Sequence, residues 1–144
     1  MKKLKLKKCL LIIVIWCLLG ITRIMILTIP FKKVAAIMGK SKEEAIKVLT
    51  ERDQRRAKKL GNLISYVSNY TPWDSKCFVQ ALTGLMLLSL FKIPSTIYFG
   101  IRKQQTNRLL AHAWLRAGEQ VITGDEERRY FIPVAKYAKH IKSY

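Results

Sequence analysis

The chain has 144 residues, 50% of them hydrophobic, which is enough apolar material for the core of one domain. Its 27 Lys and Arg against 9 Asp and Glu give a net charge of +18, which predicts affinity for an acidic partner. Nucleic acid is the least favoured partner, because aromatic residues do not alternate with the basic runs. Three cysteines without metal-type spacing argue against structural zinc and indicate reduced thiols, as in the cytoplasm.

The N-terminal region begins with the basic stretch MKKLKLKK and continues into an apolar run over residues 9–31 that only Arg23 interrupts before the final proline and phenylalanine. No small-residue cleavage site follows it, which argues against a cleaved export signal. Two interpretations stay open. The segment is either a helix that associates with a membrane or a helix buried against protein, since a helix that is apolar on all sides must be covered. We treat residues 1–40 as one basic and apolar helical region.

Pro30 predicts the end of the first helix, and residues 31–40 form a short amphipathic segment. Ser41 and Glu44 match a capping box, which predicts a helix that starts there and runs to about Leu60. The charge run within it is typical of a solvated face. We assign residues 41–144 to the second, larger domain.

The stretch 68–76 is rich in turn residues, and Asp74 or Ser75 is expected to cap an apolar helix that begins near Cys77. After this helix the hydrophobic period changes to two, which predicts strands over residues 95–102, 109–116 and 120–123. Helices followed by antiparallel strands indicate the α+β class.

Chemistry is suggested by a cysteine, a histidine and a carboxylate in this layout. Cys77 is predicted in the first turn of a buried helix, where the helix dipole and unpaired N–H groups stabilise a thiolate. His112 lies in the next layer and is the candidate general base, and Asp125 is the candidate acceptor that orients its imidazole. Glu126 and Glu127 are alternatives to Asp125. The residue types alone are equally compatible with a packed cysteine and a structural histidine.

A resemblance to a known family adds to these arguments. Residues 70–137 resemble the transglutaminase-like, microcin-processing domain of lasso-peptide leader peptidases, whose fold is papain/transglutaminase-like. Two features depart from the family pattern, because Phe78 replaces the usual leucine and Lys92 stands where glycine is commoner. The matching positions are Trp73, Cys77, Ile93-Pro94, Gly100-Ile101-Arg102, His112-Ala113-Trp114-Leu115, Gly118, Asp125 and Phe131-Ile132-Pro133.

The resemblance implies a cysteine peptidase with Cys77, His112 and Asp125 as its triad, acting without a cofactor or metal ion. Its expected substrate is a ribosomally made lasso-peptide precursor, from which it removes the leader. Because residues before 40 leave no room for a leader-recognition domain, we expect a separate leader-recognition protein and the ATP-dependent lasso cyclase as partners. A membrane surface is a further expected contact, through residues 9–31 of a cytoplasmic protein.

Two alternatives remain open at this stage. The chain is either a non-catalytic, basic, membrane-associated interaction protein, or an acyl transferase that uses the same Cys-His-Asp core. The candidates for oxyanion stabilisation and support of the site are Trp73, Gln80 and Trp114. Each of these side chains also suits ordinary packing.

Overall fold

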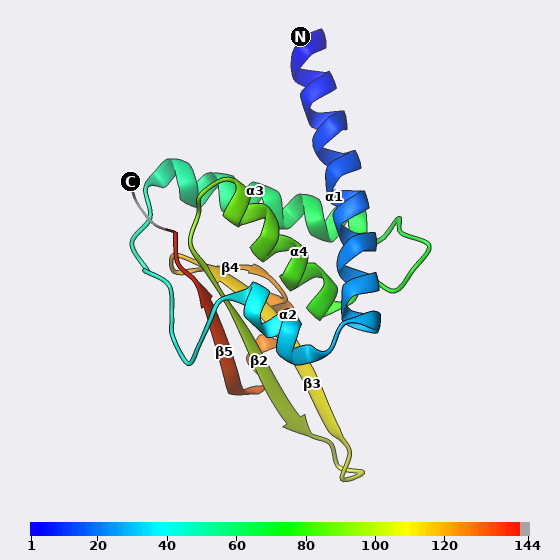
Figure 1. Cartoon of the computed structure of the whole chain (residues 1–144), viewed down its shortest axis with the longest axis vertical. Coiled ribbons are helices and arrows are strands. Elements are labelled where there is room, and N and C mark those ends of the chain that lie inside the picture. The colour runs from blue at the N-terminus through cyan, green and yellow to red at the C-terminus, as the bar shows by residue number, and fades with distance from the viewer. Residues whose placement is uncertain (142–144) are drawn as a thin grey trace.

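The computed structural model describes residues 1–141 and confirms the α+β class, with helices packed on an antiparallel sheet (Figure 1). The elements, in chain order, are α1 Lys2–Thr28, α2 Phe31–Met38, β1 Lys40–Ser41, α3 Glu51–Ser68, α4 Cys77–Leu90, β2 Ser95–Lys103, β3 Leu109–Ala117, β4 Gln120–Thr123, α5 Asp125–Arg128 and β5 Ile132–Lys139.

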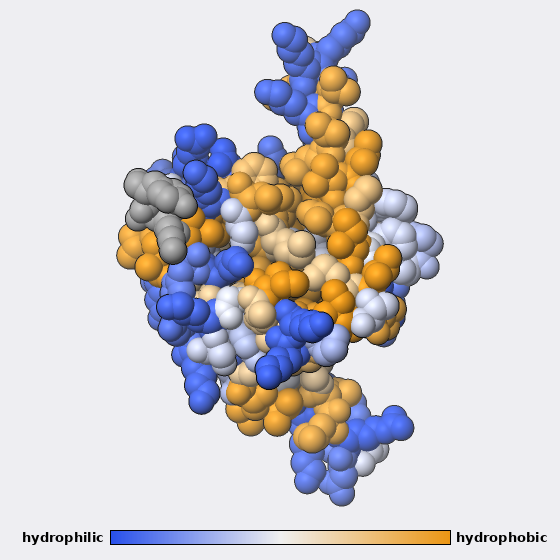
Figure 2. Space-filling view, viewed as in Figure 1, coloured by the Kyte–Doolittle hydropathy of each residue, from blue (hydrophilic) through white to orange (hydrophobic). Residues whose placement is uncertain are grey.

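Helix α1 is a core element over its second half and a projecting arm over its first half. Ile15 and Leu19 have no exposed surface, and the hydroxyl of Thr22 shares a buried hydrogen bond of 2.8 Å with that of Thr83 in α4. Residues 1–10 are exposed, and Figure 2 shows the basic end of the arm beyond an apolar stretch of surface. By length and composition α1 is able to cross a membrane, although its second half packs on the domain.

Helix α1 ends at Thr28, just before Pro30 as predicted, because proline cannot continue a helix at that point. The short amphipathic segment that follows is α2, whose Val34 and Met38 are buried. These two side chains belong to the same hydrophobic core as α3, α4 and the sheet. The assignment of residues 1–40 to a region of their own remains a prediction.

The predicted helix start at Ser41 is wrong. Ser41 lies in β1, and α3 begins only at Glu51, where the hydroxyl of Thr50 accepts a hydrogen bond of 3.2 Å from the Asp53 N–H. Tertiary contacts explain the difference, because residues 44 and 45 are bound to the sheet. The Ala45 N–H donates to the Thr96 hydroxyl at 2.9 Å, so the backbone there is committed to the sheet.

A buried arginine fixes this connecting segment to the outer face of the sheet. Arg116 donates to the Tyr98 hydroxyl at 3.0 Å and to the Ala45 carbonyl at 3.1 Å, and Tyr98 donates to Glu44 at 2.8 Å. Lys136 adds a contact of 3.3 Å to the same carboxylate. The connection between α2 and α3 is therefore held by polar contacts, with Ala45 as its buried apolar residue.

The sheet has the order β1-β5-β2-β3-β4, with all pairs antiparallel. The three strands predicted from the alternation of residues are β2, β3 and β4. Strand β5 lies between β1 and β2, and its register with β2 shifts between Phe99 and Gly100, opposite Ala135 and Pro133. A proline is tolerated there because a bulge leaves no ladder hydrogen bond for it to donate. Helices α2 and α4 cover one face of the sheet (Figure 1).

Candidate active site

Cys77 is the first residue of α4, as the sequence predicted, but neither Asp74 nor Ser75 caps this helix. Lys76 is the N-cap and provides no side-chain hydrogen bond. The Asp74 carboxylate instead lies 3.4 Å from the ammonium group of Lys76. The N–H groups of the first turn thus have no side-chain acceptor at the cap, and a helix end of this kind favours an anion beside it.

His112 reaches the site from β3. Alternation along the strand places Ala113 and Leu115 in the core beneath α4 and puts His112 on the outer face, where its ring stacks on Trp114 at 5.9 Å between ring centres. Strand β4 pairs with β3 only from Leu115 onward, so the turn at Gly124, and not a paired strand, lies against β3 beside His112. His112 is therefore buried, with 9% of its surface exposed, at the point where the chain passes from β4 to α5.

A cleft of about 640 Å³ brings the candidate residues together. Cys77, Gln80, His112 and Asp125 all line it, and residues of β4 and α5 complete its lining. Within residues 1–141, His112 and Cys77 share this cleft without a direct hydrogen bond between them. Their direct contact stays a prediction, and catalytic hydrogen bonds often tighten only when substrate binds.

The acceptor beside the imidazole is a backbone carbonyl. His112 Nε2 lies 2.7 Å from the Gly124 carbonyl oxygen. Because a carbonyl can only accept, Nε2 carries the proton, and in the neutral ring Nδ1 holds the lone pair. This contact fixes the tautomer in the way that a carboxylate does in a Cys-His-Asp triad.

Asp125 lies one residue further on, as the first residue of α5. Its carboxylate is 3.2 Å from the guanidinium of Arg128, and it is exposed. Glu126 and Glu127, the alternatives to Asp125, line the same cleft. The catalytic role of Asp125 stays a prediction, while the structure gives the orienting contact to Gly124.

Gly124 occupies a conformation that explains its residue type. Its φ of +79° lies in the left-handed region, and a Cβ there would lie 2.6 Å from the carbonyl oxygen of Ala113 and 3.2 Å from His112 Nε2. Only glycine lets the chain pass this close to β3. Sequence reasoning missed this group because a backbone oxygen has no residue-type signature; the glycine before Asp125 is the only sequence signal.

The three support candidates have different surroundings. The Gln80 amide lines the cleft and donates to the Ser75 carbonyl at 2.8 Å, which holds the turn before Cys77. Trp114 lies beside His112 and stacks on Tyr98, with ring centres 5.5 Å apart. Trp73 packs on Trp16 of α1, with ring centres 4.7 Å apart, and its role in catalysis stays a prediction, as do those of the other two.

Residues 25–136 match the sequence profile of the transglutaminase-like superfamily. The chain belongs to this superfamily. Comparison with curated proteins and with solved structures gives no match. Transglutaminase-like domains are generally cysteine-dependent enzymes, so the superfamily supports a peptidase- or acyltransferase-type core in this chain.

Proposed function

We propose that the chain is a cysteine peptidase that removes the leader from a ribosomally made lasso-peptide precursor. The observation that carries the proposal is the cleft that Cys77 and His112 line together, at the uncapped start of α4. The transglutaminase-like domain supports the reaction type. The precursor as substrate rests on the resemblance of residues 70–137 to lasso-peptide leader peptidases.

In the proposed reaction, the Cys77 thiolate attacks the scissile carbonyl and forms a tetrahedral oxyanion. The Cys77 backbone N–H at the helix start is one donor for that oxyanion, and the Gln80 amide is the candidate for the second. His112 receives the thiol proton at Nδ1 and delivers it to the amine of the leaving segment. Water then cleaves the thioester, which releases the leader and restores the thiol.

The orientation of His112 has two proposed contributors. The Gly124 carbonyl accepts from Nε2–H at 2.7 Å and holds the ring in the required tautomer. Asp125, at the start of α5, supplies negative charge near the imidazolium that forms during the reaction. Its pairing with Arg128 makes this contribution weaker than that of an unpaired carboxylate.

The proposed partners follow from the reaction. A separate leader-recognition protein presents the precursor, and the ATP-dependent cyclase uses the amine that cleavage frees. We propose a cytoplasmic location with the α1 arm against a membrane surface, because its exposed residues combine apolar side chains with the lysines of residues 2–8.

Two other functions use the same features. An acyl transferase would pass the Cys77 thioester to an amine instead of water, and the mass of the product separates these two reactions. A non-catalytic interaction protein would bind through its basic surface and need neither Cys77 nor His112. The cleft shared by these two residues favours an enzyme over this last alternative.

The deciding experiment incubates a lasso-peptide precursor and its leader-recognition protein with either the full chain or its Cys77→Ala variant. We expect mass spectrometry to show loss of the leader with the parent chain and intact precursor with the variant. A Cys9→Ala variant is the matched control, since Cys9 lies on the exposed arm, and it should process like the parent. Equal processing by the parent and Cys77→Ala would refute the assignment of the nucleophile.

A further inference from the structure

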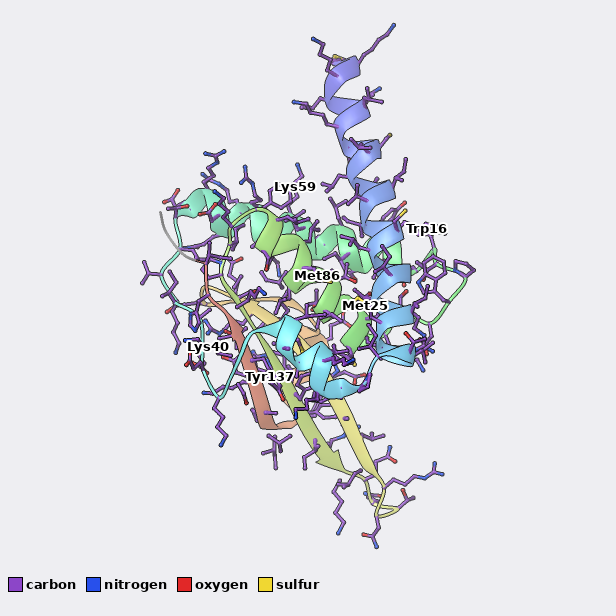
Figure 3. All side chains as sticks on the ribbon, viewed as in Figure 1. Trp16, Met25, Lys40, Lys59, Met86 and Tyr137 are labelled. Atoms are coloured by element: carbon purple, nitrogen blue, oxygen red, sulfur yellow. The ribbon has the colours of Figure 1, made fainter. Side chains whose placement is uncertain are left out.

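A second groove, of about 460 Å³, lies between α3 and the arm of α1. Three basic residues of α3 follow one another at helical spacing, so they share a face of that helix. Figure 3 labels one of them, Lys59, on the side toward which the free end of α1 projects. The lining residues are Lys8, Arg55, Lys58, Lys59, Asn62 and Leu63.

The charged side chains that line this groove are all cationic. Arg55 lies 3.6 Å from the carboxylate of Glu51 and is partly neutralised by it. For residues 1–141, no carboxylate lies within ion-pair distance of Lys8, Lys58 or Lys59. The groove therefore attracts an anionic group, and Leu63 with the lysine stems offers apolar contact beneath it.

The groove adjoins the catalytic cleft along α3. Lys58 and Asn62 line both cavities, and Ser65 continues the same α3 face into the cleft. The α3 face from Arg55 to Ser65 covers about 15 Å, at 1.5 Å per residue. An extended peptide covers that length with about five residues.

The packing of α3 on β4 keeps the two cavities side by side. A Cβ on Gly61 would collide with the Ile122 carbonyl, so the glycine lets the helix backbone lie directly against the strand that lines the cleft. The face of α3 beside Gly61 is thereby held at the mouth of the cleft.

The part of the cleft that α5 lines has the opposite charge. Asp125, Glu126 and Glu127 line it together, in a chain with only 9 acidic residues. A substrate that is acidic along its whole length would be repelled at α5, whereas one that is acidic on the α3 side alone would fit both walls. The two walls thus select for the position of charge in the substrate.

We propose that the peptide acted on by Cys77 carries an acidic segment, about five residues long, that binds the groove between α3 and the α1 arm. The inference rests on the proposed peptidase function and adds its substrate class. The shared lining by Lys58 and Asn62 favours a peptide over a lipid headgroup, because an extended chain bound in the groove can run past these two residues into the adjoining cleft.

Binding is tested in the full chain with Cys77→Ala, so that turnover does not intervene. The probes are two fluorescein-labelled decapeptides, one with five Asp or Glu residues in its first half and one with Asn or Gln at those positions. We expect anisotropy at physiological ionic strength to show tighter binding of the acidic probe. Adding Lys58→Glu and Lys59→Glu should weaken this binding at least tenfold, that is by about 1.4 kcal/mol or more.

The matched control is Lys103→Glu with Arg108→Glu at the β2–β3 hairpin, which changes the net charge equally and lies outside both cavities. It should weaken binding less than about twofold, since salt screens exposed charges that lie away from the groove. An equal loss in both double variants would overturn the proposal in favour of net charge alone. Displacement of the acidic probe by phosphatidylglycerol vesicles, dependent on Lys58 and Lys59, would overturn it in favour of a lipid. The binding assay uses the Cys77→Ala chain and does not depend on cleavage. A failure of the precursor-cleavage experiment would therefore count against the proposed function without changing the binding result.

Discussion

At the scale of single residues, the contact between His112 and the Gly124 carbonyl decides how the imidazole is used. It places the proton on Nε2 and leaves Nδ1 as the basic nitrogen. The contact depends on a left-handed glycine that passes close to β3. In the proposed reaction, a change at Gly124 that displaces its carbonyl would therefore act through the histidine, without touching the substrate.

Gly124→Ala is expected to lower kcat/KM for precursor cleavage roughly 100-fold, because the tautomer and orientation of His112 lose their fixed acceptor. The measurement is the rate of leader release followed by mass spectrometry. Gly118→Ala is the matched control: its φ is +60°, and its Cβ would meet Leu49 and the Lys47 carbonyl, away from the cleft. Both variants should lose stability by about 1–2 kcal/mol from left-handed strain. Gly124→Ala should lose more than Gly118→Ala, because its Cβ would lie 2.6 Å from the Ala113 carbonyl oxygen. A similar fall of kcat/KM in both would contradict the positioning role of Gly124.

The residue types at the site were predictable in part. Cys77 at a helix start and His112 in a strand follow from hydrophobic periodicity and from the chemistry of their side chains. Gly124 could not be predicted as the acceptor, because its contribution is a backbone oxygen whose position depends on where β4 ends. The face of His112 was predictable from alternation, but the chain that covers it at Gly124 depends on where the pairing of β4 ends.

At the scale of elements, the segment between β1 and α3 is held by charge. The hydrogen bond from Tyr98 lowers the pKa of Glu44 below its ordinary value of 4.5, and Lys136 and Arg116 act in the same direction against the opposing effect of burial. Burial and the same hydrogen bond raise the pKa of Tyr98, which keeps its hydroxyl protonated as a donor. The carboxylate form of Glu44 is thus the form that the folded chain prefers.

A carboxyl group with a lowered folded pKa stabilises the fold above its unfolded value, near 4.5, and loses this contribution as the pH falls through the folded value. Glu44→Gln is expected to lower the urea midpoint at pH 7 and to flatten its decline below pH 4.5. Glu119→Gln, on the exposed turn between β3 and β4, is the control and should keep the pH dependence of the parent. If the urea midpoint falls with pH in the same way in Glu44→Gln and in the parent, Glu44 does not contribute to the pH dependence of stability.

The elements show where local signals succeed and where they fail. Alternation in residues 95–102 and 109–116 predicted β2 and β3, because each has one face against α4 and one against polar partners. The capping pattern at Ser41 and Glu44 failed because Tyr98 and Lys136, distant in sequence, bind that glutamate. Strand β5 was missed, since Pro133 weakens a strand pattern and its partners lie far along the chain.

At the scale of the whole molecule, charge and apolar surface are segregated. The arm of α1 carries lysines at its end and exposed apolar side chains behind them, such as Leu6, Leu10 and Ile13. We expect the basic residues to attract the arm to anionic lipid and the apolar side chains then to enter the interface. The body of the domain, with the Cys77 cleft, would stay in water beside the bilayer.

We expect the full chain to co-sediment with vesicles that contain phosphatidylglycerol and to remain in the supernatant with phosphatidylcholine alone. Replacing Lys2, Lys3 and Lys5 by Gln should weaken vesicle binding about 100-fold, since each lysine near an anionic surface contributes about 1 kcal/mol. The control replaces Lys42, Lys47 and Lys103, which lie elsewhere on the exposed surface, by Gln. Equal weakening by both triple variants would indicate attraction by net charge without a role for the arm.

The second half of α1 has a consequence for anyone preparing the protein. A shortened chain that starts after residue 8 keeps Ile15, Leu19 and the bond between Thr22 and Thr83, so its folded body should survive purification. A chain that starts after Thr28, the obvious choice for removing an apolar leader to improve yield, would uncover the surface of α4 that those side chains seal. Such a fragment should collect in inclusion bodies, and its inactivity would say nothing about Cys77.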